Sequence, residues 1–279
     1  MRYVIGCWRL LLIAFYILFL VLFVILILPV LTDETRATWV RRLARVVPRL
    51  MGIRVQVTGS IPDEEAVWMG RRAGKTGFMV CSNHISFIDI FLLDSLLPVR
   101  FVAKKEIESW PVFGLIARGA GTLFIDRSRR RAVLEMTEVM NETLKAGESV
   151  LFFPEGTTGE GRVLLPFYAN LFASAVATEA DLLPVVIRYT QNGEVTTIPS
   201  YAGSIPLFTV IKRVVFSPGL AAEVQVLEPI RTAGIDRKAL CAQTSAVMSV
   251  ALGVPDATAA KEEALRRRRE AQASGTQSS

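Results

Sequence analysis

The feature that most limits how this chain can fold is an uncharged apolar run near its start, from Leu10 to Leu28. At about 1.5 Å of rise per residue, a helix of this length crosses the hydrocarbon of a bilayer. A secretory signal peptide has a shorter apolar run and a small-residue cleavage site, whereas LPVLTDE follows here. A helix buried in a soluble core is a weak alternative for so long a run. We therefore predict a retained N-terminal membrane helix.

Arginines and apolar residues then recur at helical spacing from Arg36 to Arg49. This pattern predicts a helix with a basic face and an apolar face, lying in an anionic membrane interface, which Pro48 kinks or ends. The alternative is an ordinary amphipathic helix packed on the globular domain. Two arginines, Arg2 and Arg9, precede the apolar run, and a larger number follow it. This distribution of charge predicts that the main domain is cytoplasmic. A hairpin that enters one leaflet and returns fits the same charges.

Composition narrows the classes of function. The net charge of +6 suits an anionic membrane surface, anionic substrates or nucleic acid. No motif that mixes aromatic and basic residues is present, so we expect no nucleic-acid partner. The three cysteines are odd in number and far apart, which fits a reducing compartment and neither a disulfide framework nor a zinc pattern. With a single histidine, we predict no metal site.

From Arg54 onwards, short apolar segments alternate with amphipathic ones. The segments predicted as strands are 55–58, 78–81, 101–103, 121–125, 149–153, 182–189 and 222–227. The segments predicted as helices are 87–97, 106–118 in part, 129–146, 166–180 and 236–252. Such alternation predicts an α/β fold with a mostly parallel central sheet surrounded by helices, preceded by the two N-terminal helices. We divide the chain into 1–53 (membrane-anchoring helices), 54–254 (α/β domain) and 255–279 (a basic tail expected to be disordered).

The only histidine, His84, lies where the apolar run Phe78–Cys81 stops abruptly. Asp89 follows near the beginning of the next apolar run. This spacing suits a general base at the end of a strand and a carboxylate in the first turns of the following helix. The carboxylate can accept the N–H of one ring nitrogen and leave the other nitrogen free to take a proton. The alternative is a hydrogen-bonded loop histidine beside an aspartate that caps a helix.

Two other predicted strands also end in polar or charged residues, Asp126-Arg127 and Glu155-Gly156-Thr157. The carboxyl ends of parallel strands meet at one edge of a sheet, so we expect these residues to share a crevice with His84. An arginine pairs two phosphate oxygens at once, and a Gly-Thr turn offers backbone N–H groups to an anion. Lys104 and Lys105 add positive potential nearby; the alternative for both is simple surface solvation.

Together these blocks resemble the glycerolipid acyltransferase family, which includes the 1-acylglycerol-3-phosphate (lysophosphatidate) acyltransferases. The matching motifs are NHISFID at 83–89, which holds the family's HxxxxD pattern, GTLFIDR at 121–127, FPEGT at 153–157 and LPVVI at 183–187. The resemblance runs from about Val55 to Ile187 and extends to the N-terminal helices. It implies a membrane-bound enzyme of phospholipid biosynthesis that moves an acyl chain from acyl carrier protein or coenzyme A to the free hydroxyl of a lyso-lipid, with lysophosphatidate expected first. It implies no cofactor besides this acyl thioester.

The resemblance also implies roles for individual residues. His84 takes the proton from the acceptor hydroxyl, Asp89 orients it, and the hydroxyl attacks the thioester directly. Arg127 and Glu155-Gly156-Thr157 bind the polar head of the acceptor, usually a phosphate. The strand near Pro184 supports the acyl chain or donor side. A soluble donor implies an active site on the cytoplasmic side of a bacterial inner membrane.

One position departs from the pattern of many lysophosphatidate enzymes, which have Arg where this chain has Thr158. A phosphate-binding charge is then missing or displaced to Arg162. This pattern also resembles the acyltransferases that complete ornithine lipids, and a lyso-ornithine lipid is therefore the alternative acceptor. A non-catalytic protein that binds anionic lipid is a further alternative, against which the presence of both His84 and Asp89 argues.

Overall fold

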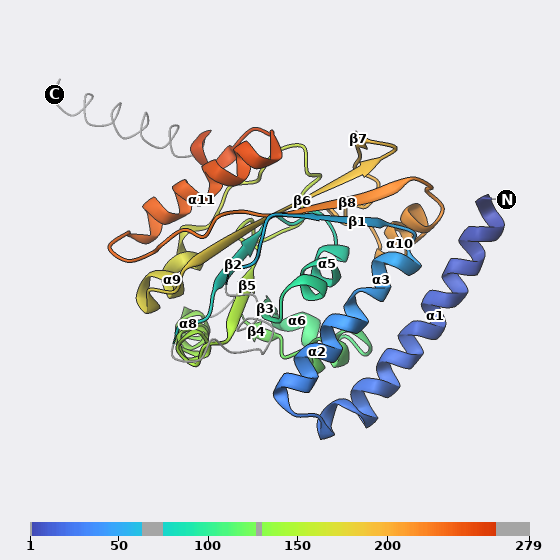
Figure 1. Ribbon diagram of the computed structural model, residues 1–279, viewed down its shortest axis with the longest axis horizontal. Coiled ribbons are helices and arrows are strands. Elements are labelled where there is room, and N and C mark those ends of the chain that lie inside the picture. The colour runs from blue at the N-terminus through green and yellow to red at the C-terminus, as the bar shows by residue number, and fades with distance from the viewer. Residues whose placement is uncertain (1, 63–74, 127–129, 261–279) are drawn as a thin grey trace.

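The computed structural model describes residues 2–62, 75–126 and 130–260. Within these residues, a twisted eight-stranded sheet has helices on both of its faces and the N-terminal helices at one side (Figure 1). The strands are β1 (Arg54–Thr58), β2 (Met79–Ser82), β3 (Val99–Lys104), β4 (Leu123–Ile125), β5 (Ser149–Phe152), β6 (Leu182–Gln191), β7 (Glu194–Val195) and β8 (Leu220–Val226).

The strand order is β1-β8-β6-β2-β5-β3-β4, with β7 paired to β6. All neighbouring strands in this order are parallel except β8 and β6, and β7 is antiparallel to β6. The predicted α/β fold with a mostly parallel sheet is confirmed. Because β2, β5, β3 and β4 are adjacent and parallel, the segments that follow them leave the sheet at the same edge.

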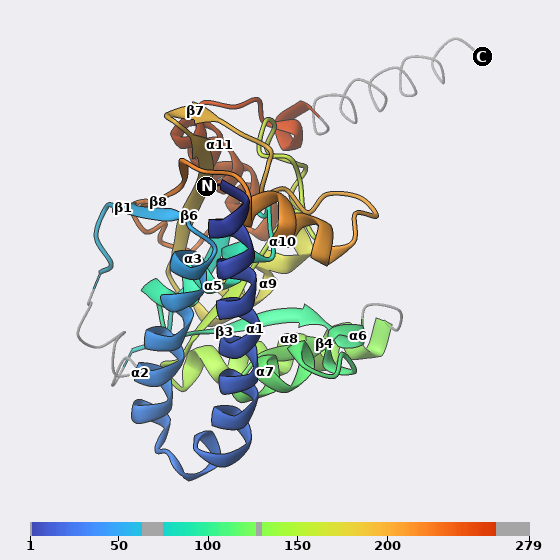
Figure 2. The same cartoon turned by 90° about the vertical axis from the view of Figure 1, so that its right-hand side faces the viewer.

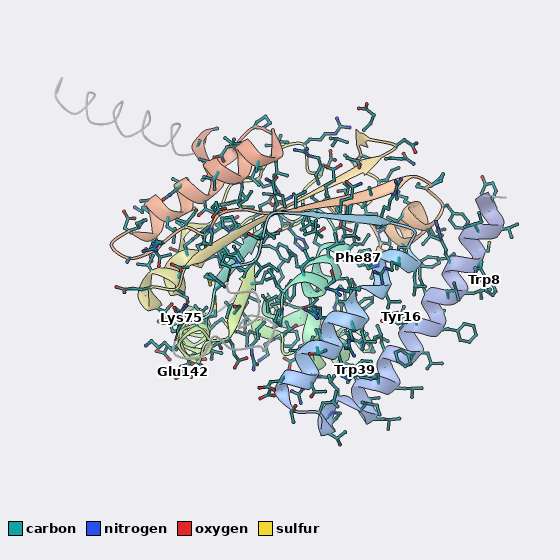
Figure 3. All side chains as sticks on the ribbon, in the orientation of Figure 1. Trp8, Tyr16, Trp39, Lys75, Phe87 and Glu142 are labelled. Carbon is teal, nitrogen blue, oxygen red and sulfur yellow. The ribbon has the colours of Figure 1, made fainter. Side chains whose placement is uncertain are left out.

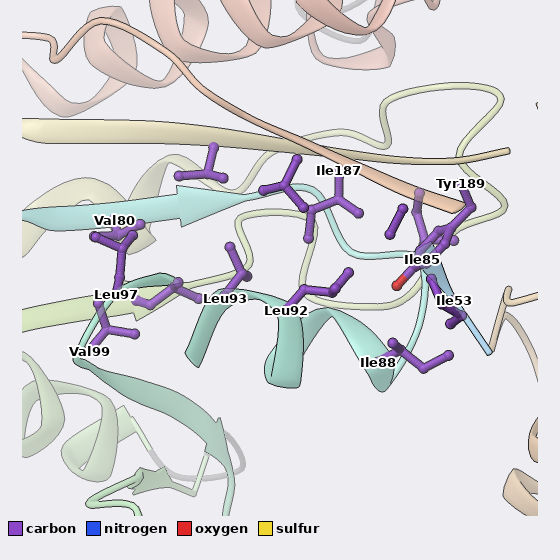
Figure 4. Packing of buried hydrophobic residues seen from close by; sticks show 14 of the residues in the cluster. Ile53, Val80, Ile85, Ile88, Leu92, Leu93, Leu97, Val99, Ile187 and Tyr189 are labelled. Atoms are coloured by element: carbon purple, nitrogen blue, oxygen red, sulfur yellow. The ribbon is translucent and has the colours of Figure 1, made fainter. Parts of the chain in front are cut away.

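Alternating side chains of the central strands enter two hydrophobic clusters, one on each face of the sheet. In β2 and the residue before it, Phe78 and Val80 enter one cluster, whereas Met79 and Cys81 enter the other. Helices α5 (Ile88–Leu96) and α10 (Leu207–Val215) cover the first face, and Figure 4 shows Leu92 and Leu93 of α5 packed beneath the sheet. The second face is covered by α8 (Arg130–Lys145), η2 (Ala169–Phe172), α9 (Ala173–Thr178) and α11 (Arg237–Leu252).

The N-terminal helices form a hairpin beside this domain (Figures 1 and 2). The hairpin consists of α1 (Arg2–Leu26), η1 (Leu28–Val30), α2 (Asp33–Ala44) and α3 (Val46–Leu50). The break between α2 and α3 lies one turn before Pro48, where a proline ring opposes the carbonyl of the fourth residue before it. The side chains of Tyr16 and Trp39 lie between α1 and α2, whereas Trp8 points away from the domain (Figure 3).

One face of α1 packs on the protein. The Phe23 and Trp39 rings are 5.4 Å apart, and the Tyr16 hydroxyl donates to the Leu43 carbonyl at 2.7 Å. The other face is an exposed apolar stripe whose members recur every three or four residues: Val4, Trp8, Leu11, Phe15, Leu18, Leu22 and Leu26. By length and composition, residues 3–30 can cross a membrane. Helix α2 packs on α5, where Arg45 Nε donates to the Ser95 carbonyl at 3.0 Å, so its contact with a membrane interface stays a prediction.

Two short helices follow β3, namely α6 (Lys105–Glu108) and α7 (Phe113–Gly119), as the interrupted pattern of 106–118 predicts. The expected helix over 166–180 begins only at residue 169, because the preceding residues pair with the chain beyond α11. Leu164 forms an isolated β-bridge with Asp256, and the backbone N–H of Phe167 donates to Thr258 at 2.9 Å. The predicted boundary at residue 254 stays a prediction, and 261–279 of the expected tail lies outside the described residues. Strand β7 and helix α10 were not predicted.

Candidate active site

An asparagine side chain ends strand β2 and begins the turn that carries His84. The last backbone pair between β2 and β6 joins Ser82 to Val185. One step further, the Asn83 amide nitrogen donates to the Ile187 carbonyl at 2.9 Å, and the Ile187 N–H donates back to the Asn83 side-chain oxygen at 2.8 Å. The Asn83 side chain thus takes the place of one backbone pair between β2 and β6. The backbone can leave the sheet here while both polar groups of Ile187 stay hydrogen-bonded.

The structure brings the two residues of the HxxxxD pattern together. His84 Nδ1 lies 2.9 Å from Oδ2 of Asp89, and because a carboxylate only accepts, Nδ1 carries the hydrogen. The imidazole stacks on the ring of Phe153, with centroids 3.7 Å apart and planes within 9°. The His84 side chain is 17% exposed, and its Nε2 has no hydrogen-bond partner among the described residues. This nitrogen is therefore available to a substrate.

The carboxylate of Asp89 is fully buried and receives hydrogen bonds from several directions. Its Oδ2 accepts from the backbone N–H groups of Ile85 at 2.7 Å and Ser86 at 2.8 Å, in addition to His84. Its Oδ1 accepts from the hydroxyl of Tyr189 at 2.7 Å. Asp89 also lies in the first turn of α5, where the helix dipole favours a negative charge. These donors fix the orientation of the carboxylate that holds the imidazole.

Tyr189 comes from β6, a hundred residues from Asp89 in the sequence. It lies beside Ile85 and Ile88 at the N-terminal end of α5 (Figure 4). Burial, and then the negative charge of Asp89, raise the pKa of Tyr189 well above its ordinary value. The hydroxyl therefore stays protonated and acts as a donor. Sequence reasoning missed Tyr189, because no periodicity links it to the HxxxxD pattern.

Glu155 is buried, with 4% of its surface exposed, and both of its carboxyl oxygens contact backbone groups. Oε1 accepts from the N–H of His84 at 2.7 Å and Oε2 from the N–H of Leu165 at 3.1 Å. Burial raises the pKa of Glu155 to about 8, the charge of Asp89 adds to this rise, and the two N–H donors oppose it. Glu155 thus ties the histidine turn to the segment beyond the FPEGT motif. Its expected contact with the acceptor's head group stays a prediction.

Three loops are joined by further hydrogen bonds around His84. The N–H of Gly159 donates to the His84 carbonyl at 2.8 Å, and the N–H of Tyr201 donates to the Ile85 carbonyl at 2.9 Å. The hydroxyl of Thr158 donates to the Tyr201 carbonyl at 2.7 Å. The residue that departs from the family pattern therefore connects two loops of the site.

Four more of the predicted residues lie along the same edge of the sheet. Gly156 adopts φ +68° and Thr157 is exposed, so the turn after Glu155 faces outwards. Lys104 and Lys105 are exposed at the end of β3. Arg127 lies outside the described residues. Strand β4 ends at Ile125, two residues before Arg127. In the sheet it is three strands away from β2, a separation of about 14 Å at roughly 4.8 Å per strand.

No group of three or more His, Cys, Asp or Glu side chains within the described ranges could hold a metal ion. A cavity of about 580 Å³ lies near the amino ends of β3 and β5 and includes Val99 and Ser149 in its wall. It is therefore at the edge of the sheet opposite to His84.

A partly exposed histidine held by a buried aspartate, at the carboxyl edge of a mostly parallel sheet, has the geometry that general-base catalysis requires. A family model described as Acyltransferase matches residues 54–188. The chain belongs to the acyltransferase family, and it is an acyltransferase. The predicted family and class of enzyme are confirmed.

Several relatives are similar over most of the chain. The 1-acyl-sn-glycerol-3-phosphate acyltransferase of Neisseria meningitidis is 38% identical over 192 residues, which cover 68% of this chain and 71% of the relative. The lyso-ornithine lipid O-acyltransferase of Pseudomonas aeruginosa is 33% identical over 214 residues, covering 77% and 76%. The crystal structure of the 1-acyl-sn-glycerophosphate acyltransferase from Thermotoga maritima matches with a TM-score of 0.67 at 22% identity, covering 91% of this chain and 97% of that one, and shows the same fold.

The raised pKa of Glu155 predicts a pH dependence of stability. The folded protein keeps the proton up to about pH 8, whereas the ordinary value for an unfolded chain is 4.5. Between these values the folded state binds more protons, so its stability falls as the pH rises. We expect the melting temperature in detergent to fall between about pH 5 and pH 8, and to fall less in Glu155→Gln. Glu194→Gln, at an exposed position of β7, serves as the matched control. An identical slope in Glu155→Gln and the wild type would contradict this assignment.

Proposed function

We propose that this protein is a membrane-bound O-acyltransferase that transfers an acyl chain from acyl carrier protein or coenzyme A to the free hydroxyl of 1-acylglycerol-3-phosphate, giving phosphatidic acid. The observation that carries the proposal is the His84–Asp89 pair, with Nε2 of His84 available at the carboxyl edge of an acyltransferase sheet. The substrates, the residue roles and the orientation in the membrane belong to this proposal.

In the proposed reaction, Nε2 of His84 takes the proton of the acceptor hydroxyl as its oxygen attacks the thioester carbonyl. A C–O bond forms and gives a tetrahedral intermediate. The intermediate collapses with cleavage of the C–S bond, and the imidazolium returns its proton to the departing thiolate. Asp89 stabilises the imidazolium, and the Phe153 ring fixes the plane of the imidazole. No acyl-enzyme forms, because the substrate supplies the nucleophile.

Two observations support a phosphate-bearing acceptor. The Gly156-Thr157 turn and the exposed Lys104 and Lys105 lie at the edge of the sheet that carries His84, and Arg127 follows the strand next to β3. The relative from Neisseria meningitidis, named for 1-acyl-sn-glycerol-3-phosphate, is also the more similar of the two described above.

Thr158 favours a second candidate, acylation of a lyso-ornithine lipid. Its hydroxyl is bonded to the Tyr201 carbonyl, and no cation stands at this position to meet a phosphate. The Pseudomonas aeruginosa relative carries the name of that activity. The reaction and the roles of His84 and Asp89 are the same for both acceptors.

The proposed placement is in the inner membrane of a bacterium, with His84 reached from the cytoplasm, where soluble thioesters are present. The inner face of α1 packs on the domain, and its outer face is apolar and exposed. This arrangement supports a hairpin embedded in one leaflet rather than a helix that crosses the bilayer alone. Either placement keeps a lyso-lipid within reach of the α/β domain.

Replacement of His84 by Ala should lower acyl transfer by about a thousandfold or more, because the first proton transfer loses its base and the second loses its acid. Asp89→Asn should also lower activity severely, because a neutral amide cannot stabilise the imidazolium that the proposed reaction forms. Purified variants in detergent, supplied with labelled acyl-coenzyme A and lysophosphatidate, provide the measurement. Arg237→Ala, at an exposed site on α11, is the control. Wild-type turnover in a folded His84→Ala variant would contradict the proposed mechanism.

Tyr189→Phe tests a positioning role. A hydrogen bond to a charged group contributes about 1.5–3 kcal/mol, so we expect kcat to fall about 10- to 100-fold with little change in KM. Without the hydroxyl, more negative charge remains to hold a protonated imidazole, and the acid limb of the pH–kcat profile should move to higher pH. Tyr168→Phe, at a tyrosine that is 56% exposed, is the matched control. If only the melting temperature changes, Tyr189 serves the fold and not the reaction.

The acceptor is tested by offering lysophosphatidate and lyso-ornithine lipid in parallel with one labelled acyl donor. We expect kcat/KM to be at least about 10-fold higher for lysophosphatidate, which corresponds to about 1.4 kcal/mol of preference. Acylation of lyso-ornithine lipid alone would overturn the acceptor assignment and leave the His84 mechanism intact. Failure of both acceptors, with both lipids dispersed and the donor intact, would count against the proposed function itself.

A further inference from the structure

Helix α10 has two unlike faces. Val210 and Val214 are buried in the hydrophobic core beneath the sheet. On the outer side, Phe208 is 60% exposed, and Lys212 and Arg213 are exposed. The Lys212 ammonium lies 5.3 Å from the centroid of the Phe208 ring. The outer face therefore presents an aromatic ring together with two cations.

This face continues the exposed stripe of α1. The ring of Phe216, just after α10, lies 6.0 Å from that of Tyr3 and packs against Gly6, where a Cβ would meet it at 2.2 Å. The Arg9 guanidinium of α1 donates to the carbonyl of Val215, the last residue of α10, at 3.4 Å. In Figure 2, α1 and α10 lie side by side on the same side of the molecule. The two helices thus share one continuous surface.

The charges on this surface have a single sign. Neither residues 1–32 nor residues 195–222 contain an aspartate or glutamate. The charged residues of both segments are all basic, namely Arg2, Arg9, Lys212 and Arg213. By contrast, the basic pair Arg237 and Lys238 of α11 directly follows an acidic residue, Asp236. The α10 surface therefore combines exposed apolar side chains with basic ones, and neither segment that forms it contains an acidic residue.

We propose that the outer face of α10, together with the exposed stripe of α1, is a docking surface for an anionic lipid bilayer. Helices that lie in a membrane interface insert side chains such as phenylalanine at the headgroup boundary, and their lysines and arginines are attracted to anionic headgroups. Phe208 enters the headgroup region, while Lys212 and Arg213 contact lipid phosphates. Continuity with α1 and the absence of acidic residues support a membrane as the occupant.

Docking of α10 has a consequence for the site described above. The loop before α10 contains Tyr201, whose N–H binds the Ile85 carbonyl in the histidine turn and whose ring meets that of Phe87 edge-on. A membrane contact at α10 therefore lies close along the chain to the turn that carries His84. The inference goes beyond the proposed function and does not depend on which lipid is acylated.

The test places a polarity-sensitive fluorophore on α10 of the full chain. The exposed Cys7 is replaced by Ser, Cys81 and Cys241 remain buried, and Phe208→Cys is labelled. The protein is reconstituted into phosphatidylcholine vesicles with and without phosphatidylglycerol. We expect blue-shifted emission and protection from iodide quenching that increase with phosphatidylglycerol. Val250→Cys, at an 83% exposed position of α11, is the matched control and should remain open to iodide.

Charge reversal separates lipid docking from other causes of protection. Lys212→Glu/Arg213→Glu should reduce the protection that phosphatidylglycerol gives by about 10-fold or more, since each cation near the surface adds to the attraction. Arg237→Glu/Lys238→Glu changes the net charge equally and should leave the protection unchanged. Equal quenching at Phe208→Cys and Val250→Cys in both vesicle types would overturn the proposal. Protection in detergent that grows with protein concentration would assign the surface to a second copy of the chain instead.

Discussion

The buried carboxylate of Asp89 is the group on which the rest of the site depends. An ion removed from water is costly unless its environment supplies hydrogen bonds. Here the donors are His84, Ile85 and Ser86 of the histidine turn, and Tyr189 on β6. Two parts of the fold that are far apart in the sequence therefore supply the donors. The fold holds the carboxylate, and the carboxylate in turn fixes the imidazole.

Much of this arrangement could be predicted from local patterns. The apolar segments and the residues at their ends predicted the parallel sheet, and the single histidine with Asp89 predicted the pair that the structure brings to 2.9 Å. The bonds of Asn83 to Ile187 and of Tyr189 to Asp89 could not be predicted, because each joins residues about a hundred positions apart. The family resemblance implied a ligand-binding role for Glu155. Its two bonds to backbone groups depend on burial, which the sequence does not show.

The N-terminal helix illustrates a different limit. Nearly every residue of α1 is apolar, so its sequence does not distinguish the face that meets protein from the face that meets lipid. The structure makes that distinction through shape: Gly6 admits the ring of Phe216, and Gly119 of α7 lies against Val24 and Leu28. Helix α10 was not predicted for a different reason. It has only nine residues, and no side chain caps its start, so the sequence around it lacks the usual signal for the beginning of a helix.

The bond between Thr158 and Tyr201 ties the proposed choice of acceptor to two loops rather than to one side chain. An engineer who installs an arginine at position 158 to attract phosphate also removes the hydroxyl that anchors the segment leading into α10. Such a variant gains a charge and loses a crosslink in the same step. Redirecting the enzyme to another head group therefore calls for paired substitutions, in which a new anchor for the Tyr201 loop accompanies each new charge.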